Sequence, residues 1–267
     1  MKIIKSQMGM TLIELMIAMT LSIGVVYAVT NILITSNKTA TLSDSLAQSQ
    51  ETGRFVTSYL NHHILRAGYA PGEDSLPPFE LECVAPNTTM CTLNQNSGAG
   101  DQIAIIRTAT TDDNVSCFGS DMGLAVDTVV VDVFWVEIDP DTNLSSLYCL
   151  TYDRGTALPV NNNTKQPIAA GVVAIHALYG QSISDLDSGQ RNVTQYVAPS
   201  ELALDSGGAP DWSRVYAMKI GVLTQSFEEI SGAATERNYI LLDADTYTYN
   251  NRFAYQVFST TIARANY

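Results

Sequence analysis

Basic residues are scarce in this sequence. Its 267 residues include 14 Lys and Arg against 27 Asp and Glu, for a formal net charge of −13 at pH 7. No stretch is enriched in Lys or Arg, which argues against nucleic acid as a ligand and against affinity for an anionic membrane surface. No linker divides the chain beyond Lys38 either, so the sequence predicts one sizeable core there.

Residues suited to catalysis are also few. There are 3 His and 4 Cys, and no C-x-x-C spacing. His62 and His63 are neighbours in a helical pattern, where successive side chains point about 100° apart, and His176 lies in a strand pattern. We expect structural roles for all three. No Ser or Cys can be matched to a base, so the sequence predicts neither an enzyme nor a cofactor.

Two short motifs match ligand sites only in part. Gly98 and Gly100 open like a dinucleotide-binding loop, but Ile103 stands in place of the third glycine and no helix pattern follows. We expect a turn before a strand. Asp185 and Asp187 alternate as in calcium loops, but the closing glutamate is missing. They are weak metal candidates, and a hydrated turn is the favoured interpretation.

Charge is absent from a long stretch near the N-terminus. After Glu14, no charged residue occurs before Lys38, and residues 10–34 are predominantly apolar apart from Glu14. At about 1.5 Å per residue, a helix over this stretch is long enough to cross a membrane. Lys2 and Lys5 precede it, which places the N-terminus inside and the bulk of the chain outside. A carboxylate at membrane depth is costly, so Glu14 predicts a partner that neutralises it.

Two ordinary explanations of this stretch remain open. It could be a secretory signal, since residues 26–28, Val-Tyr-Ala, could serve a signal peptidase. Glu14 inside the apolar run, and the length of that run, count against a signal. It could also be a plain transmembrane anchor, but that leaves Glu14 unexplained.

The cysteines all follow the apolar stretch, at Cys83, Cys91, Cys117 and Cys149. An even number in an exported chain indicates disulfides. Three connectivities are possible. Cys83–Cys91 with Cys117–Cys149 is favoured, because a short closed loop and a longer loop tied to a strand need no crossing. In the chain-entropy model these bonds contribute about 2.5 and about 3.5–4 kcal/mol.

The helix continues beyond residue 34. Apolar residues recur there at helical spacing: Leu42, Leu46, Val56, Leu60 and Ile64. Gly53 costs roughly 1 kcal/mol relative to alanine in a helix interior. Gly68 and then Pro71 are stop signals. The pattern therefore predicts an amphipathic helix over residues 35–69.

Residues 70–267 are β-rich. Runs of Val, Ile, Thr and aromatic residues predict strands at 102–107, 128–138, 146–152, 172–179, 215–223, 238–242 and 253–262. Residues 131–137 alternate poorly, so we expect that strand to be covered on both faces. The fold class is α+β, with a long N-terminal helix, apolar in its first half and amphipathic in its second, packed on a β-rich C-terminal domain.

Several motifs resemble those of type IV pilins. The sequence GMTLIE at residues 9–14 resembles the class III signal GFTLIE, with Met10 in place of the usual phenylalanine. QETGRF at 50–55 and LRAGY at 65–69 resemble the "QENGRF … LRxAGY" blocks of PilW-type minor pilins. CFG at 117–119 and LYC at 147–149 resemble their "CxG … LxC" pair, and residues 172–180, 212–226 and 257–266 resemble their later strands.

This resemblance implies processing and assembly. A prepilin peptidase would remove the leader, residues 1–9, by cutting between Gly9 and Met10, and would methylate the new amine of Met10. Residues 10–34 would form the membrane and assembly helix, in which Glu14 would pair with the cationic N-terminus of a neighbouring subunit. The family's paired cysteines support the Cys117–Cys149 disulfide.

The implied function is that of a structural minor pilin that primes or caps a type IV pilus beside other minor and major pilins. It would sit in the inner membrane with its C-terminal domain in the periplasm, and later in the pilus at the cell surface. Two alternatives remain open: a type II secretion pseudopilin of the GspJ kind, and a pilus-tip adhesin whose loops bind a surface.

Overall fold

The computed structural model describes residues 10–71, 76–80, 90–183, 192–230, 232 and 234–264. The chain divides into two compact units, Met1–Asp44 and Ser45–Tyr267. The helix α1, Leu12–Leu65, belongs to both, because the boundary falls within it. Three short 3-10 helices, η1 (Val160–Asn162), η3 (Pro199–Glu201) and η4 (Trp212–Arg214), lie in the second unit.

The helix α1 is continuous and contains no proline. Gly68 follows it with φ +73°, and its N–H donates to the carbonyl of Ile106 over 2.8 Å. Only glycine adopts this left-handed conformation without steric cost. The expected stop is therefore confirmed. The amphipathic character begins later than expected, because every described residue up to Asp44 is exposed and the first buried position of the helix is Ser45.

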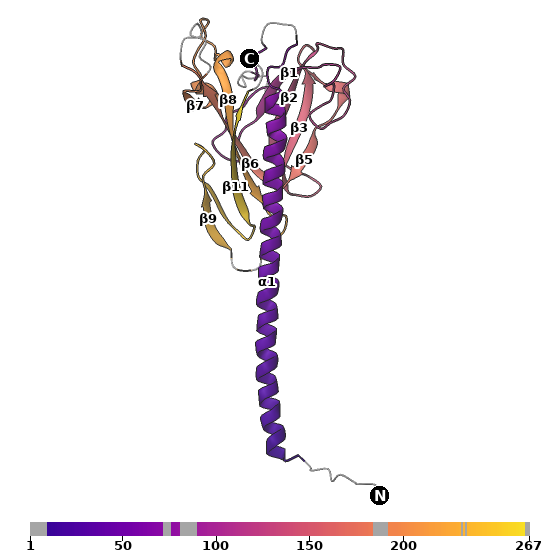
Figure 1. Ribbon diagram of the computed structural model, residues 1–267, viewed down its shortest axis with the longest axis vertical. Helices are drawn as coiled ribbons and strands as arrows, with labels where there is room; N and C mark the ends of the chain where they lie inside the picture. Colours follow the sequence, from indigo (N-terminus) through magenta and orange to yellow (C-terminus); the bar gives the residue numbers. More distant parts are fainter. Residues whose placement is uncertain are drawn as a thin grey trace. The chain divides into compact units, whose positions relative to one another are not determined.

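The first sheet of the second unit is antiparallel, in the order β1-β2-β3-β4, with β5 also paired to β3 (Figure 1). Its strands are β1 (Ile103–Thr108), β2 (Val129–Ile138), β3 (Ser145–Asp153), β4 (Leu158–Pro159) and β5 (Gln166–Ala170). Residues 130–134 of β2 are all buried, which confirms that this strand is covered on both faces.

The second sheet has the order β11-β8-β6-β7, again with antiparallel neighbours. Its strands are β6 (Val172–Gln181), β7 (Gln195–Val197), β8 (Val215–Gln225) and β11 (Tyr255–Ala263). A separate hairpin pairs β9 (Thr235–Tyr239) with β10 (Tyr247–Asn251), and Leu241 beyond β9 packs against Leu223 of β8.

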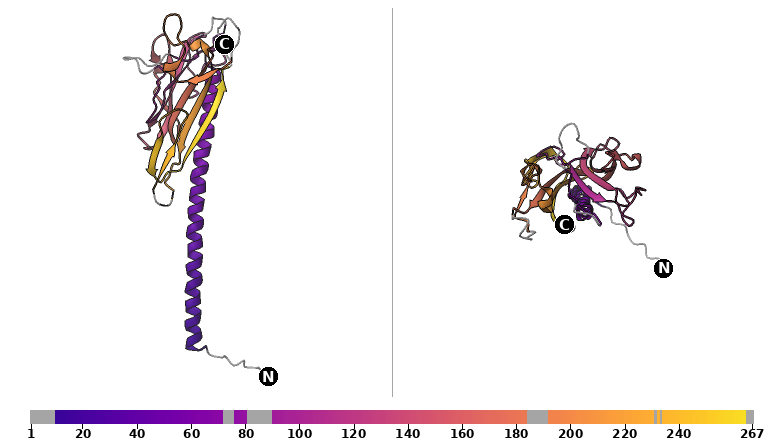
Figure 2. Two further views of the ribbon diagram at one scale, coloured as in Figure 1. Left: turned by 90° about the vertical axis from the view of Figure 1, so that its left-hand side faces the viewer. Right: turned by 90° about the horizontal axis from the view of Figure 1, so that it is seen from above.

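The main core lies where α1 meets both sheets, and the end-on view in Figure 2 shows the helix beside them. The helix contributes Val56, Leu60 and Ile64, which are 0–1% exposed. Phe134 of β2 and Ile220 of β8 pack in the same cluster. Burial of side chains of this size contributes roughly 1.5–3 kcal/mol each. The part of α1 from Ser45 to Leu65 is thus part of the β unit.

The strands expected at 102–107, 128–138, 146–152, 172–179, 215–223 and 253–262 are confirmed to within a few residues. The strand expected at 238–242 is wrong in position. The strand β9 ends at Tyr239, and Leu242 has φ +56°, so the chain turns there and buries Leu241 against Gly221. The sequence did not predict β4, β5, β7 and β10, which are short and rich in Pro, Ala, Asn or Gln.

Candidate functional site

The first turn of α1 forms a reciprocal capping box. The N–H and the hydroxyl of Thr11 both donate to Glu14 Oε2 over 2.9 Å, and the Glu14 N–H lies 3.4 Å from Thr11 Oγ1. In this T-x-x-E arrangement, two of the helix's unpaired backbone donors gain acceptors. A carboxylate here also interacts favourably with the positive end of the helix dipole. Contacts within the chain itself therefore hold the Glu14 carboxylate at the N-terminal end of α1.

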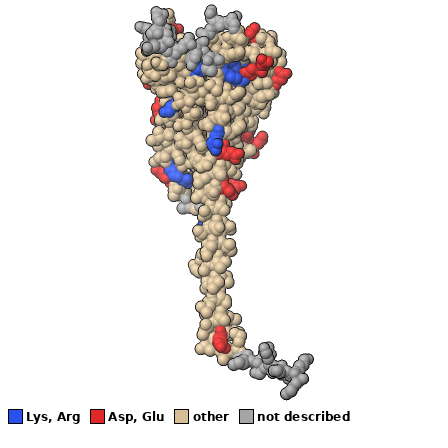
Figure 3. Space-filling view, viewed as in Figure 1, with Lys and Arg blue, Asp and Glu red and all other residues tan. Residues whose placement is uncertain are grey.

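The helix that follows presents a continuous apolar surface, which carries no charge between Glu14 and Lys38 (Figure 3). Its large apolar side chains are all exposed, from 78% at Leu12 to 47% at Ile34. This is the one described helix long and apolar enough to cross a membrane. A patch of this extent requires lipid or another protein to cover it.

Within the second unit, a buried hydrogen bond fixes α1 to β8, and close packing fixes it to β11. Ser49 and Thr224 share a hydrogen bond of 2.7 Å between buried hydroxyls. Gly53 lies under the ring of Phe258, and a Cβ at that position would stand 2.1 Å from the ring. The glycine that the sequence marks as a weak point in the helix therefore lies where the helix and β11 approach too closely for a larger side chain.

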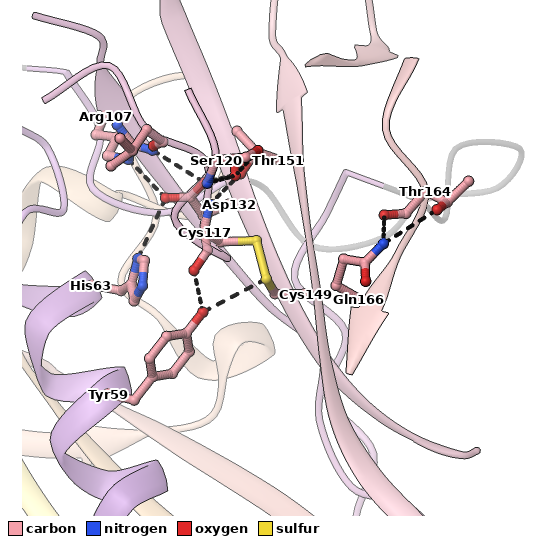
Figure 4. The surroundings of a disulfide bond; sticks show 12 residues. Tyr59, His63, Arg107, Cys117, Ser120, Asp132, Cys149, Thr151, Thr164 and Gln166 are labelled. Carbon is pink, nitrogen blue, oxygen red and sulfur yellow. Dashed lines mark hydrogen bonds and ion pairs between the residues drawn. A yellow bond between two sulfur atoms is a disulfide. The ribbon is translucent and has the colours of Figure 1, made fainter. Parts of the chain in front are cut away.

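The Cys117–Cys149 disulfide is present, as expected, and lies beside α1 (Figure 4). The hydroxyl of Tyr59 donates to the carbonyl oxygen of Cys117 and lies 3.6 Å from Cys149 Sγ. Cys91 is also disulfide-bonded. Its expected partner, Cys83, lies outside the described residues.

A buried ion pair adjoins the disulfide. Arg107 Nε donates to Asp132 Oδ2 over 2.7 Å, and the two side chains are each 1% exposed. Thr151 donates its hydroxyl to Asp132 over 2.6 Å and accepts the N–H of Cys117 over 2.8 Å. Burial alone would raise the pKa of Asp132, but the charges and hydrogen bonds around it, of which the Arg107 charge is the largest, together hold that pKa well below its usual range.

His63 of α1 faces this ion pair, but its imidazole ring is neutral. Arg66 Nη2 lies 2.8 Å from His63 Nδ1, and a guanidinium can only donate, so Nδ1 accepts and the ring is neutral. Burial lowers the pKa of His63 in spite of Asp132 at 3.6 Å. Arg66 itself pairs with Asp113 over 2.6 Å. His63 thus connects α1 to the ion pair of the first sheet, and Arg66, directly after α1, connects the helix end to Asp113 in the loop that follows β1.

A second buried histidine bridges two carboxylates. His176 of β6 lies 3.0 Å from Asp101 Oδ2 through Nδ1 and 2.7 Å from Asp243 Oδ1 through Nε2. Burial would lower its pKa, but the two carboxylates outweigh burial and raise it above the usual value. Asp101 also accepts the N–H groups of Gln95 and Ala177. The residue is hydrogen-bonded within a strand, as expected.

The structure does not bring the remaining candidates into one site. Gly9, Asp185 and Asp187 lie outside the described residues. His62 is exposed, while His63 is buried. The described residues contain no group of three His, Cys, Asp or Glu side chains arranged to hold a metal. Gly98 and Gly100 both have positive φ and form the expected turn before β1.

The sequence patterns did not predict the contacts of Tyr59, Arg107 and Asp132. One signal was available: a carboxylate in the middle of an apolar strand, VVVDVFW, predicts a buried cation nearby, because an unpaired buried charge is costly. The end of IAIIRT in β1 could have supplied that cation.

The chain combines an exposed apolar helix, whose first turn holds Glu14 in a capping box, with a disulfide-bonded antiparallel β unit in which the helix ends. This is the organisation of a pilin-like protein. The sequence profile of the family described as type IV pilus-assembly protein W, PilW, matches residues 133–266. The chain belongs to this family of type IV pilus proteins. The match covers half of the chain and does not include the leader or the apolar helix.

A structural comparison gives a type IV-like pilin from Thermus thermophilus, with 13% sequence identity and a TM-score of 0.45. The similarity covers 80% of this chain and 96% of that one. Among curated proteins, no sequence matches this chain significantly.

Proposed function

We propose that this chain is a structural minor pilin, without catalytic activity, that primes or caps a type IV pilus. The observation that carries the proposal is the exposed apolar helix with a single acid, Glu14, in its first turn. Membership of the type IV pilus-assembly family supports the pilus over a secretion pseudopilus. No contact among the described residues favours the adhesin alternative.

Processing would occur at the start of this helix. A prepilin peptidase cuts between Gly9 and Met10 and methylates the amine of Met10. The new cationic terminus then lies one residue before Thr11, beside a carboxylate that the capping box already holds in place. Before assembly, residues 10–34 anchor the chain in the inner membrane and the β unit lies in the periplasm.

Assembly would exchange lipid for other pilins around the helix. Glu14 neutralises the N-terminal amine of a neighbouring minor or major pilin, because two unpaired charges in an apolar environment are each costly. The small residues Ala18, Ser22, Gly24 and Ala28 permit close approach of neighbouring helices. Nothing lies within 4 Å of a Cβ built at Gly24, so this face is open to a neighbour.

The first test is the intact mass and N-terminal sequence of the protein extracted from membranes of cells that assemble pili. We expect a chain that begins at N-methylated Met10. A chain that begins at Val29 would indicate ordinary secretion, and an uncut chain beginning at Met1 a plain anchor. Either result would overturn the proposed processing.

Glu14→Gln tests the assembly role, because glutamine at this position retains the capping box but removes the charge. We expect normal cleavage but loss of the subunit from sheared pili. Glu51→Gln is the matched control, since Glu51 is an exposed acid on the same helix within the second unit. Wild-type incorporation of the Glu14→Gln chain would contradict the role assigned to Glu14.

A further inference from the structure

The strand β11 is an open edge of the second sheet. It pairs with β8 along its whole length, Tyr255–Ala263, without a bulge, and no other described strand pairs with it. None of its nine residues is charged and none is proline. Charges, prolines, bulges or short length normally protect such edges, because the unpaired backbone groups can otherwise pair with another strand.

The other edges of the two larger sheets, among the described residues, are protected. Along β1, the N–H of Glu80 bonds to the carbonyl of Ala104, and the N–H of Ile106 bonds to that of Pro78. The strand β7 has three residues, and β4 and β5 are short and each contain a proline. The long, uncharged edge of β11 is the exception.

The direction of its backbone groups follows from two flanking hydrogen bonds. The N–H of Arg264 donates to the carbonyl of Tyr216, and the carbonyl of Ala254 accepts the N–H of Ser226. Both bonds point toward β8. Since backbone groups alternate between the two edges of a strand, the even-numbered residues of β11 face β8. The N–H and C=O groups of Val257, Ser259 and Thr261 therefore face the open edge.

The side chains alternate in the same way. Gln256 and Phe258 face α1, where Gln256 donates to the carbonyl of Leu46 and Phe258 covers Gly53. Val257, Ser259, Thr261 and Ala263 are exposed on the opposite face. A strand laid along this edge would extend the sheet beside small, uncharged side chains, on the edge opposite β8.

We propose that the edge of β11 accepts an extended strand from a different exported pilus subunit, which joins the sheet beside β11. A second copy of this chain fits less well. Two copies of β11 related by a two-fold axis would be antiparallel. Because β11 runs in the same direction as α1, from Leu46 to Gly53 opposite Gln256 to Phe258, the two α1 helices would also be antiparallel.

Chains anchored in one membrane from the same side cannot adopt that arrangement, so the choice of partner rests on the proposed anchoring. The net charge of −13 also disfavours contact between two copies. An uncharged edge on an acidic chain is suited to a strand that brings no charge of its own to the contact.

The test uses the full-length protein in cells that assemble pili, with a photo-crosslinking amino acid at Thr261 and, as a control site, at the exposed Leu158 of β4. We expect an adduct from Thr261 alone, whose linked peptide maps to a β-strand of another exported pilus subunit. No adduct, an adduct with a second copy of this chain, or one with a helical segment would each overturn the proposal.

Ser259→Pro, introduced with the crosslinker at Thr261, tests the backbone pairing. The N–H of residue 259 faces the open edge, so proline there removes a hydrogen-bond donor from that edge and leaves the hydrogen bonds between β11 and β8 intact. We expect the adduct to fall about tenfold, while Ser259→Thr leaves it unchanged. Ser259→Lys, which places a charge on the edge, is a second variant that preserves the backbone.

The Cys117–Cys149 disulfide and the urea unfolding midpoint establish that each variant is folded. An unchanged adduct in both folded variants would overturn the proposal. Cleavage at Gly9 is expected to be normal in these chains, so failure of the edge contact is distinguishable from failure of the proposed processing or of the Glu14 contact.

Discussion

The hydroxyl of Tyr59, in α1, donates a hydrogen bond to the carbonyl oxygen of Cys117, one half of the Cys117–Cys149 disulfide. The disulfide ties the loop that follows β1 to β3, and this loop carries the carbonyl to the helix (Figure 4). Burial raises the pKa of Tyr59, so its hydroxyl remains a donor at neutral pH. We therefore expect oxidation of the cysteines and docking of α1 to be energetically coupled.

Tyr59→Phe is expected to reduce the free energy of unfolding by about 1–2 kcal/mol, because the Cys117 carbonyl loses its donor while the ring keeps its contacts with His63 and Phe134. Urea unfolding of the full-length chain in detergent measures this. Tyr148→Phe is the control, since its hydroxyl donates to the partly exposed side chain of Asp139 over 3.0 Å. We expect the control to cost less than half as much.

A double-mutant cycle tests the coupling itself. In a chain with Cys117→Ser and Cys149→Ser, the loop is no longer tied to β3, and Tyr59→Phe is expected to cost markedly less. An equal cost with and without the disulfide would show that the two act independently.

Asp132→Asn is expected to cost about 3–5 kcal/mol, because it leaves the buried Arg107 without a counter-charge. Glu137→Gln, at its surface pair with Lys165, whose side chains are 37–45% exposed, is expected to cost under about 1 kcal/mol. Denaturant midpoints at constant m-value measure both. Similar losses for the two variants would mean that the Arg107–Asp132 pair contributes no more than a surface pair.

Much of the fold follows from local patterns in the sequence. The length of α1 and its end shortly before Gly68 follow from the spacing of its apolar residues and from stop signals. The long strands follow from runs of β-branched residues. The strand β10, YTYNN, lacks such a run and is stabilised by a cluster of tyrosines, in which Tyr249 and Tyr255 stack 4.3 Å apart. Contacts between distant segments, which single-sequence patterns do not encode, decide such elements.

The candidate site divides in the same way. Thr11 and Glu14 lie three residues apart, so the capping box that they form can be recognised in the sequence. Arg107 and Asp132 are 25 residues apart, and His176 and Asp243 are 67 apart. Nothing in the sequence fixes the register that brings those pairs together. The roles of Gly9 and Met10 in processing and of Glu14 in assembly remain predictions.

The His176 bridge predicts a pH-dependent stability. Its folded pKa is raised above the usual 6.5, so the bridge stabilises the fold fully below about pH 6.5, and this contribution is lost as pH rises through the folded pKa. His176→Gln is expected to cost about 2 kcal/mol at pH 5.5 and clearly less at pH 8.5. Urea unfolding at the two pH values measures the difference.

His62→Gln is the control for this pH dependence, because His62 is exposed on the same protein. Its cost is expected to be small at both pH values. A cost of His176→Gln that is the same at pH 5.5 and pH 8.5 would exclude a protonated His176 between Asp101 and Asp243.

Gly53→Ala separates helix propensity from packing. In an isolated helix, alanine is about 1 kcal/mol more favourable than glycine. Here the new Cβ would stand 2.1 Å from Phe258, so the ring or the helix must move, and we expect a net loss of about 1–3 kcal/mol. Gly24→Ala, where nothing lies within 4 Å, is the matched control and is expected to be neutral or stabilising.

The double variant Gly53→Ala with Phe258→Ala identifies the cause of that loss. Removing the ring creates the room that the Cβ needs, so the cost of Gly53→Ala is expected to disappear in the Phe258→Ala background and to become the small gain that propensity predicts. Urea unfolding of the four chains of this cycle measures the interaction energy. If Gly53→Ala costs as much without the Phe258 ring as with it, the close approach of α1 to β11 is not the reason for glycine at position 53.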